Sequence, residues 1–447
     1  MMPLVRRKEV GDFAPIGPLL PMGAGWRLLL GSLVLSGLLV PTRALGQLTG
    51  DQVPRTRIIK SKEQIESEVQ NRRFRLGPVR LIPILNIYNA GYDSNVFGLP
   101  AGKEISDWTA SVAAGFRWIV PIGAKLYAVG NATPSYVWYR HLSERTFLGG
   151  SYSAYLLGFF NRASLEVGGI NSKDLAYVSS EARSQVIQTT LQGSVKMEVE
   201  VVSNFSLFAT FEAARLRFGQ ETAPAGFIDT REFQRTEGAA GGGVRYRFSS
   251  SLDVAASYQK TRTEFVFVPK ISDNQSDAYL VTIHYDRPRF YLNFAGGYRH
   301  GGPWNGSSFA SYTTPTGSYF MSYFLARTLE LQAYGDRRVT YGVLTPQFTQ
   351  TRYGGGVNFE VNKSILLRVL GVWGTNVYGE TGTGATFIPG RTDKTADYGA
   401  GFSVIVYRKV VLSGLFTESR YNSVLPELDR KVRRFTTGIS FDGVFNR

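Results

Sequence analysis

The stretch RRFTTGISFDGVFNR (residues 433–447) carries the clearest structural pattern in the sequence. Apolar and polar residues alternate through it almost to the end of the chain. In an extended strand successive side chains point to opposite faces. One face is then lined by Phe435, Thr437, Ile439, Phe441, Gly443 and Phe445, and the other by Arg434, Thr436, Ser440 and Asp442. The stretch therefore predicts a β-strand with one apolar and one polar face.

The same period of two recurs upstream, for example in residues 205–213, 244–248, 290–299 and 352–361. Short turns such as Asn161-Arg162 alternate with longer Gly/Ser/Asp/Pro-rich stretches, among them residues 219–229, 301–315 and 379–393. Alternation of tight turns and long loops is typical of barrels with short periplasmic turns and long external loops. We therefore predict an all-β fold, a transmembrane antiparallel up-and-down β-barrel of about 18 strands. Sixteen strands is the alternative, if residues 163–171 and 316–326 are not strands.

The closing strand resembles the C-terminal signal that the barrel-assembly machinery reads. Phe435, Ile439, Phe441 and Phe445 are the residues of this signal. Such barrels usually end on the aromatic residue itself, whereas this chain adds Asn446-Arg447.

Composition agrees with a barrel and excludes several classes of site. The chain has 447 residues, of which 13% are aromatic and 49 are glycine. It contains no cysteine, which excludes disulfides, thiolate metal sites and a cysteine nucleophile. The formal net charge is +15, but the basic residues are dispersed singly, so we do not expect nucleic-acid binding.

The apolar run LLLGSLVLSGLLV (residues 28–40) is too short for a transmembrane helix and fits the core of a secretory signal peptide. Small residues at Ala44 and Gly46 predict cleavage after Gly46, so residues 1–46 form the signal peptide, with Met22 as an alternative start. The mature chain is then expected in the bacterial outer membrane, in contact with lipid and lipopolysaccharide.

Residues 47–77 are polar and are predicted to form a periplasmic arm. Ser61-Lys62-Glu63-Gln64 has the form of a capping box, and Ile65 and Val69 are spaced for one side of a short helix. A disordered leader is the alternative. Residues 78–447 form the barrel.

The opening of the barrel carries a family resemblance. Residues 78–85 lead into Gly91-Tyr92-Asp93-Ser94-Asn95-Val96-Phe97, and this stretch resembles the start of the β-barrel porin 2 type of outer-membrane protein. The resemblance covers about twenty residues closely and the other strands only in architecture. It implies an outer-membrane barrel, encoded in some members beside exopolysaccharide export systems, and it brings no catalytic residues.

Chemical sites other than a pore have weak support. Asp93, Ser94 and Asn95 could supply oxygen ligands to Ca²⁺, but the same residues also shape turns. The three histidines, His141, His284 and His300, are too scattered for a metal motif. His284 lies two residues from Asp286, yet a solitary wet-face histidine is the simpler interpretation. We expect no cofactor, no metal and no enzymatic activity.

Charged residues alternate with the apolar ones and are expected to line the lumen. The candidates are Arg245, Arg247, Arg299, Arg352, Glu212 and Glu360. Rings of charge set ionic selectivity, and an excess of arginine favours anions. The alternatives are that these arginines pair with carboxylates, or lie near the rim and bind lipid phosphates. We predict a porin-like channel for small solutes, anions among them. The alternative is an outer-membrane part of a polysaccharide export system, with export proteins as partners.

Overall fold

The computed structural model describes residues 62–70, 74–177, 185–219, 230–266, 273–307, 309–342, 347–379, 390–407, 410–425 and 428–442. The predicted signal peptide (1–46), Phe445 and most of the arm before Lys62 lie outside these residues. No helix in the described part of the chain is long and apolar enough to cross a membrane.

The described chain consists almost entirely of long antiparallel strands, after one helix and one short strand. These two are α3 (Lys62–Gln70) and β1 (Phe74–Leu76). The long strands are β2 (Val79–Asp93), β3 (Asp107–Ile122), β4 (Leu126–Tyr139), β5 (Phe147–Phe159), β6 (Ala163–Tyr177), β7 (Gln185–Val202), β8 (Phe205–Phe218), β9 (Arg235–Ser249), β10 (Leu252–Phe265), β11 (Asn274–Arg287), β12 (Phe290–Pro303), β13 (Tyr312–Ala326), β14 (Leu329–Thr340), β15 (Phe348–Asn362), β16 (Ile365–Tyr378), β17 (Arg391–Tyr407), β18 (Val410–Asn422) and β19 (Arg430–Asp442). Two single 3₁₀ turns, η1 (Ser143–Arg145) and η2 (Thr230–Phe233), lie between strands.

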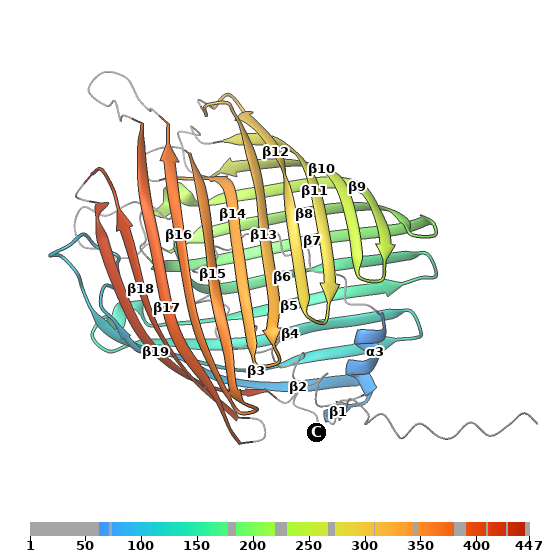
Figure 1. The fold of residues 1–447 in the computed structure, drawn as a ribbon, viewed down its shortest axis with the longest axis horizontal. Coiled ribbons are helices and arrows are strands. Elements are labelled where there is room, and N and C mark those ends of the chain that lie inside the picture. The colour runs from blue at the N-terminus through green and yellow to red at the C-terminus, as the bar shows by residue number, and fades with distance from the viewer. Residues whose placement is uncertain are drawn as a thin grey trace, which may run out of the picture.

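The strands close into one barrel (Figure 1). Each strand from β2 to β19 pairs with the next one along the chain, and β19 pairs with β2. The prediction of 18 strands is confirmed, and the two doubtful segments, 163–171 and 316–326, are parts of β6 and β13. The short strand β1 pairs with the start of β2.

Two of the predicted loops are shorter than the sequence indicated. β12 runs to Pro303 and β13 begins at Tyr312, so much of the stretch 301–315 is strand. β17 likewise begins at Arg391, inside the predicted loop 379–393. Ladder pairs between Gly301 and Tyr312 continue the sheet there, because glycine-rich sequence in a barrel wall does not by itself end a strand.

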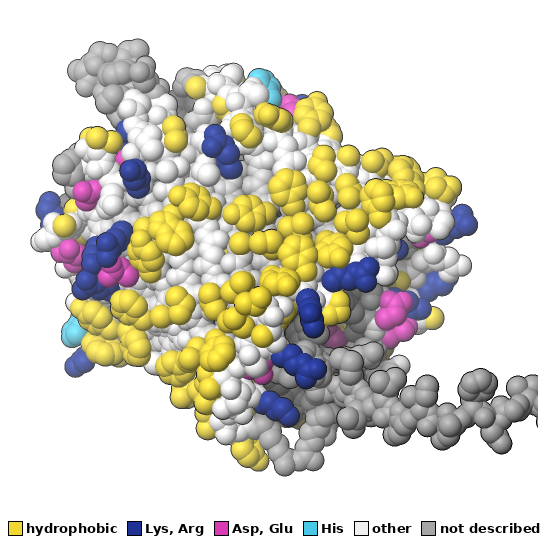
Figure 2. All heavy atoms as spheres, in the orientation of Figure 1, with side chains coloured by type: hydrophobic (Ala, Val, Ile, Leu, Met, Phe, Trp, Pro, Cys, Tyr) yellow, Lys and Arg dark blue, Asp and Glu magenta, His cyan; other side chains and the backbone are white. Residues whose placement is uncertain are grey.

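The alternation predicted from the sequence produces an apolar outer surface. Large apolar side chains are exposed on the outside of strand after strand, including Trp108, Val112, Phe116, Tyr136, Trp138, Leu156, Phe211, Tyr246, Phe294, Val357, Phe359 and Val369. Figure 2 shows hydrophobic side chains covering much of the visible wall, with basic side chains gathered towards its margins. A continuous exposed apolar band on a closed barrel is the surface that lipid covers. We assign the short-turn end to the periplasm and the long-loop end to the exterior.

The face of each strand opposite the apolar band points into the barrel. Leu156 on β5 is exposed to the outside, for example, and its neighbours Tyr155 and Leu157 are buried on the inside. Residues directly opposite each other in the ladder share a face, so the inner face can be followed from strand to strand.

Helix α3 lies against this inner wall at the periplasmic end. Ile65 is 1% exposed and packs with Ile119, Tyr127, Tyr155 and Leu157 of β3, β4 and β5. The Tyr127 hydroxyl donates a hydrogen bond to Glu66 Oε1 at 3.1 Å. The predicted short helix is therefore present, and its apolar side is covered by the barrel.

Candidate functional site: the inner face of the barrel

The structure places the predicted luminal residues on the inner face. Arg245 lies between the exposed Val244 and Tyr246 of β9, and it is opposite Ser206 and Ala255 in the ladder. Arg247, Arg299, Arg352, Glu212 and Glu360 likewise alternate with outward apolar residues of their strands. All six therefore project towards the lumen.

Arg245 is held between two carboxylates. Its Nη1 lies 2.6 Å from Glu198 Oε2 of β7, and its Nε lies 3.6 Å from Asp253 Oδ1 of β10. The guanidinium also lies over the ring of Phe208, 5.4 Å from its centroid. Its charge is thus largely balanced by the wall, and the side chain is fixed in place.

Arg352 is paired in a similar way. Its Nη2 and Nε donate to Asp336 Oδ1 at 2.7 and 3.0 Å. Asp336 also lies beside a second arginine, since Arg338 Nε is 3.6 Å from Asp336 Oδ2. Arg338 and Arg352 thus share the carboxylate of Asp336 on the inner face of β14 and β15.

Arg299 differs from these two. Its Nη1 donates to the hydroxyl of Ser276 in β11 at 2.9 Å. A hydroxyl partner orients the guanidinium without neutralising it. Arg299 therefore keeps a positive charge on the inner face that no carboxylate among the described residues neutralises.

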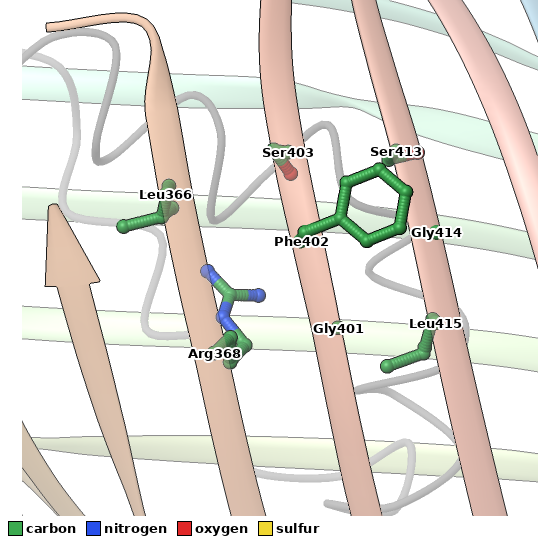
Figure 3. Close-up of a pocket in the computed structure, with 8 residues that line it drawn as sticks. All are labelled: Leu366, Arg368, Gly401, Phe402, Ser403, Ser413, Gly414 and Leu415. Atoms are coloured by element: carbon green, nitrogen blue, oxygen red, sulfur yellow. The ribbon is translucent and has the colours of Figure 1, made fainter. Parts of the chain in front are cut away.

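A small hollow in the inner wall lies beside another arginine, Arg368 (Figure 3). Arg368 Nε donates to Asn358 Oδ1 at 2.8 Å, and Asn358 Nδ2 donates to Glu330 Oε2 at 2.8 Å. The hollow is lined by Leu366, Arg368, Gly401, Phe402, Ser403, Ser413, Gly414 and Leu415. The hydrogen bonds from Arg368 through Asn358 to Glu330 hold a buried cation and a buried carboxylate in the wall. These residues make the wall polar without exposing a charge to the lumen.

The arrangement is a lumen lined by alternating positive and negative charges. The sequence singled out the arginines and three glutamates, Glu198, Glu212 and Glu360, but it did not assign Asp253, Asp336 or Glu330 to them. Asp336 and Arg352 are direct ladder partners, but a long external loop joins β14 and β15, so the sequence did not fix their register. Arg245 and Glu198 lie on strands separated by β8, so no local pattern indicates their contact.

The family-like segment Gly91–Phe97 begins in the seam of the barrel, where Gly91, Tyr92 and Asp93 of β2 pair with β19. Asp93 Oδ1 accepts a hydrogen bond from the Asn95 backbone at 2.9 Å, and Asp93 Oδ2 lies 2.6 Å from Arg434 Nε of β19. The Asn95 side chain makes two hydrogen bonds to the backbone of Leu99: Nδ2 donates to the carbonyl oxygen, and Oδ1 accepts from the backbone N–H. The oxygens considered for Ca²⁺ are thus used in a turn and an ion pair. Within the described ranges, no group of three or more His, Cys, Asp or Glu side chains could hold a metal ion.

The end of this segment and the loop that follows it fold onto the inner wall at the external end. Val96, Phe97 and Leu99 pack with Val137, Tyr139 and Phe147, which are inner-face residues of β4 and β5. The Arg145 guanidinium lies 4.5 Å from the centroid of the Phe97 ring. Together with α3 at the other end, this loop narrows the lumen along the β3–β6 side.

The histidines remain apart. His141 Nδ1 lies 3.0 Å from Asp107 Oδ1 at the start of β3, and His300 Nδ1 lies 2.8 Å from the Thr313 hydroxyl on the outer face. His284 faces the lumen with its ring edge against Tyr291. Each contact is with a different partner, so the three rings do not meet in one site.

An external loop is fastened to the barrel by a tyrosine hydroxyl. Tyr341 Oη donates to Thr263 Oγ1 at 2.9 Å and accepts from Asn274 Nδ2 at 3.1 Å. Burial raises the pKa of Tyr341 from its usual 10.0 to about 12. The neutral phenol is therefore the form that stabilises the loop.

Replacing Tyr341 by phenylalanine is expected to lower the free energy of unfolding by about 1–2 kcal/mol at neutral pH, because buried hydrogen-bonding groups lose their partner. A raised folded-state pKa gives stability that is present below pH 10 and lost as the pH rises to about 12. Urea titrations at several pH values should show the difference between wild type and variant shrinking over that window. Tyr298→Phe, on the exposed outer face of β12, is the matched control. A pH-independent difference would contradict this account.

The closed sheet, the apolar outer band and the charged inner face define an outer-membrane β-barrel protein. No protein-family model and no curated protein matches the chain. Similar solved structures include OccAB3 of Acinetobacter baumannii, at 9% identity and a TM-score of 0.48, covering 82% of this chain and 100% of that one. Pseudomonas aeruginosa OccK2 (OpdF) in complex with glucuronate matches at 11% identity and a TM-score of 0.48, covering 83% and 99%. The outer membrane protein OpdK of P. aeruginosa matches at 10% identity and a TM-score of 0.49, covering 81% and 99%.

Proposed function

We propose that the protein is a channel that passes small solutes across the outer membrane, with a weak preference for anions. The observation that carries the proposal is the closed barrel of 18 described strands with a charged inner face. Barrels of 16–18 strands are wide enough to leave an aqueous channel. A charged face inside such a barrel is wetted by the solutes that pass through it.

The pairing of the luminal arginines limits the selectivity. Arg245 and Arg352 each lie against a carboxylate, so their fields are partly cancelled. Arg299, which is bonded to the Ser276 hydroxyl, leaves a modest positive charge on the inner face. The expected preference for anions is therefore smaller than the number of arginines suggests.

The test is a recording of single channels from the refolded protein in planar bilayers, with the reversal potential measured under a salt gradient. We expect steady openings and a reversal potential displaced towards that of the anion. Arg299→Gln should move the reversal potential towards zero, because it removes a luminal charge. Arg217→Gln, which removes an exposed charge from the outer face of β8, should leave it unchanged.

A correctly folded barrel without conductance would overturn the proposal that the protein is a channel. The polysaccharide-export alternative would then become the leading hypothesis, although no contact of the described residues specifically favours it.

A further inference from the structure

Three basic side chains converge on one carboxylate on the outer surface of the barrel. Glu418 of β18 is contacted by Arg420 of the same strand and by Lys431 and Arg433 of β19. The donor-to-oxygen distances are 2.7 Å from Arg420 Nε, 3.2 Å from Lys431 Nζ and 2.8 Å from Arg433 Nε. These four residues are called the rim cluster below.

The rim cluster faces outward rather than into the lumen. Glu418 is opposite Tyr398 and Arg433 in the ladder, and Phe416, two residues before it, is exposed on the same face. Luminal solutes therefore do not reach these side chains from inside the barrel. Whatever they bind lies in or next to the membrane.

The cations of the rim cluster are accessible, and Glu418 is the one carboxylate among the described residues that pairs with them. The side chains of Arg420, Lys431 and Arg433 are 51%, 41% and 56% exposed, whereas that of Glu418 is 12% exposed. Three positive charges around one negative charge leave a net charge of about +2 on this patch. Figure 2 shows basic side chains gathered beside acidic ones on the wall where β17–β19 approach their external ends.

Aromatic side chains fix the level of the rim cluster in the membrane. Directly on its membrane side, the outward row contains Phe416 and Phe435, which are ladder partners, and Tyr92, which is opposite Phe435. Trp108 continues the row beside Tyr92, with ring centroids 5.6 Å apart. Aromatic girdles lie at the interface between the apolar core and the headgroups. The cluster lies on the external side of this girdle, two to four residues before β18 ends at Asn422.

We propose that the rim cluster is a binding site for the phosphate groups of a phosphorylated glycolipid in the outer leaflet, the chemistry that lipopolysaccharide presents. Guanidinium groups bind phosphate oxygens through paired N–H donors, and a lysine adds a point charge. Glu418 holds the three cations together, which offsets their mutual repulsion and prepares the site before lipid arrives. Tyr398 supports one side, since the Arg420 guanidinium lies 6.0 Å from its ring centroid.

The inference is tested on the refolded full chain freed of lipid. Wild type and the variant Arg420→Gln/Lys431→Gln/Arg433→Gln are titrated with lipid A, and bound lipid is measured by native mass spectrometry. The same titration is repeated with dephosphorylated lipid A and with inorganic phosphate. The matched control variant is Arg215→Gln/Arg217→Gln, which removes exposed outward cations from β8 that share no carboxylate among the described residues.

We expect the triple variant to bind lipid A about a hundredfold more weakly than wild type, because each Lys or Arg near an anionic surface adds to the affinity. The control variant should bind like wild type, and removal of the lipid phosphates should abolish the difference. Equal affinity of wild type and triple variant would overturn the proposal. Competition by inorganic phosphate at the same phosphate concentration would also overturn it, since the site would then take free phosphate.

If the triple variant does not fold, the double variant Lys431→Gln/Arg433→Gln replaces it, and a loss of about tenfold or more is expected. Folding of each variant is checked by circular dichroism and by heat-dependent gel mobility. Single-channel conductance should not change in any of them, so this test is independent of the channel itself.

Discussion

Replacing Gly91 by valine is expected to prevent the barrel from closing between its first and last long strands. A Cβ atom at residue 91 would lie 1.8 Å from the Phe435 carbonyl oxygen and 2.8 Å from Thr436 Cα. Both are backbone atoms of β19, so no side-chain rotation relieves the contact. The expected loss in free energy of unfolding exceeds about 3 kcal/mol, the upper range for overpacked cores.

The measurement is the fraction of protein that reaches the heat-resistant folded band after refolding into detergent or lipid. Gly238→Val is the matched control, since a Cβ atom added to this glycine of β9 meets no atom within 4 Å. We expect the control to fold like wild type and Gly91→Val to remain unfolded. A normally folded Gly91→Val barrel would show that β2 and β19 do not pair as described.

Replacing Ile65 by aspartate is expected to release helix α3 from the inner wall and to increase single-channel conductance. Ile65 is 1% exposed among apolar residues of three strands, so the variant buries a carboxylate without a partner. The lost packing of a large apolar side chain alone costs about 2–5 kcal/mol. A helix of nine residues has little stability of its own, so α3 should detach from the wall rather than stay docked with a buried carboxylate.

The matched control is Ser67→Asp, which adds the same charge at an exposed position of α3. Conductance of this control should equal that of wild type, and conductance of Ile65→Asp should be larger. Barrel stability should be nearly the same in both. Unchanged conductance in Ile65→Asp would mean that α3 does not obstruct the pathway.

The barrel could be predicted from the sequence because lipid imposes a simple rule on every strand. Each strand needs apolar residues outside and polar residues inside, so the period of two seen at Phe435–Phe441 recurs around the sheet. The closing strand is observed as predicted over the described residues, with Phe435 and Ile439 exposed outside. Strand number followed from the same pattern combined with the spacing of turns.

The pairing of charged side chains inside the lumen depends on contacts that the alternation of apolar and polar residues does not reveal. Alternation places Arg245 on the inner face, but its contact with Glu198 crosses an intervening strand and depends on side-chain reach. The position of α3 could not be predicted from the sequence either. Two apolar residues, Ile65 and Val69, indicate that one side of the helix is covered, but not by which surface.

The central claim is that the inner face borders a water-filled pathway, and a pair of cysteine variants tests it most directly. The chain contains no cysteine, so Ser257→Cys and Ala256→Cys each introduce a single thiol into β10. Ser257 faces the lumen opposite Gly243 and Leu280, whereas Ala256 is exposed on the outer face. A charged, membrane-impermeant thiol reagent is added while single channels are recorded. A stepwise fall in conductance with Ser257→Cys, and none with Ala256→Cys, is the result we predict. A silent channel, or equal responses from the two variants, would contradict the account.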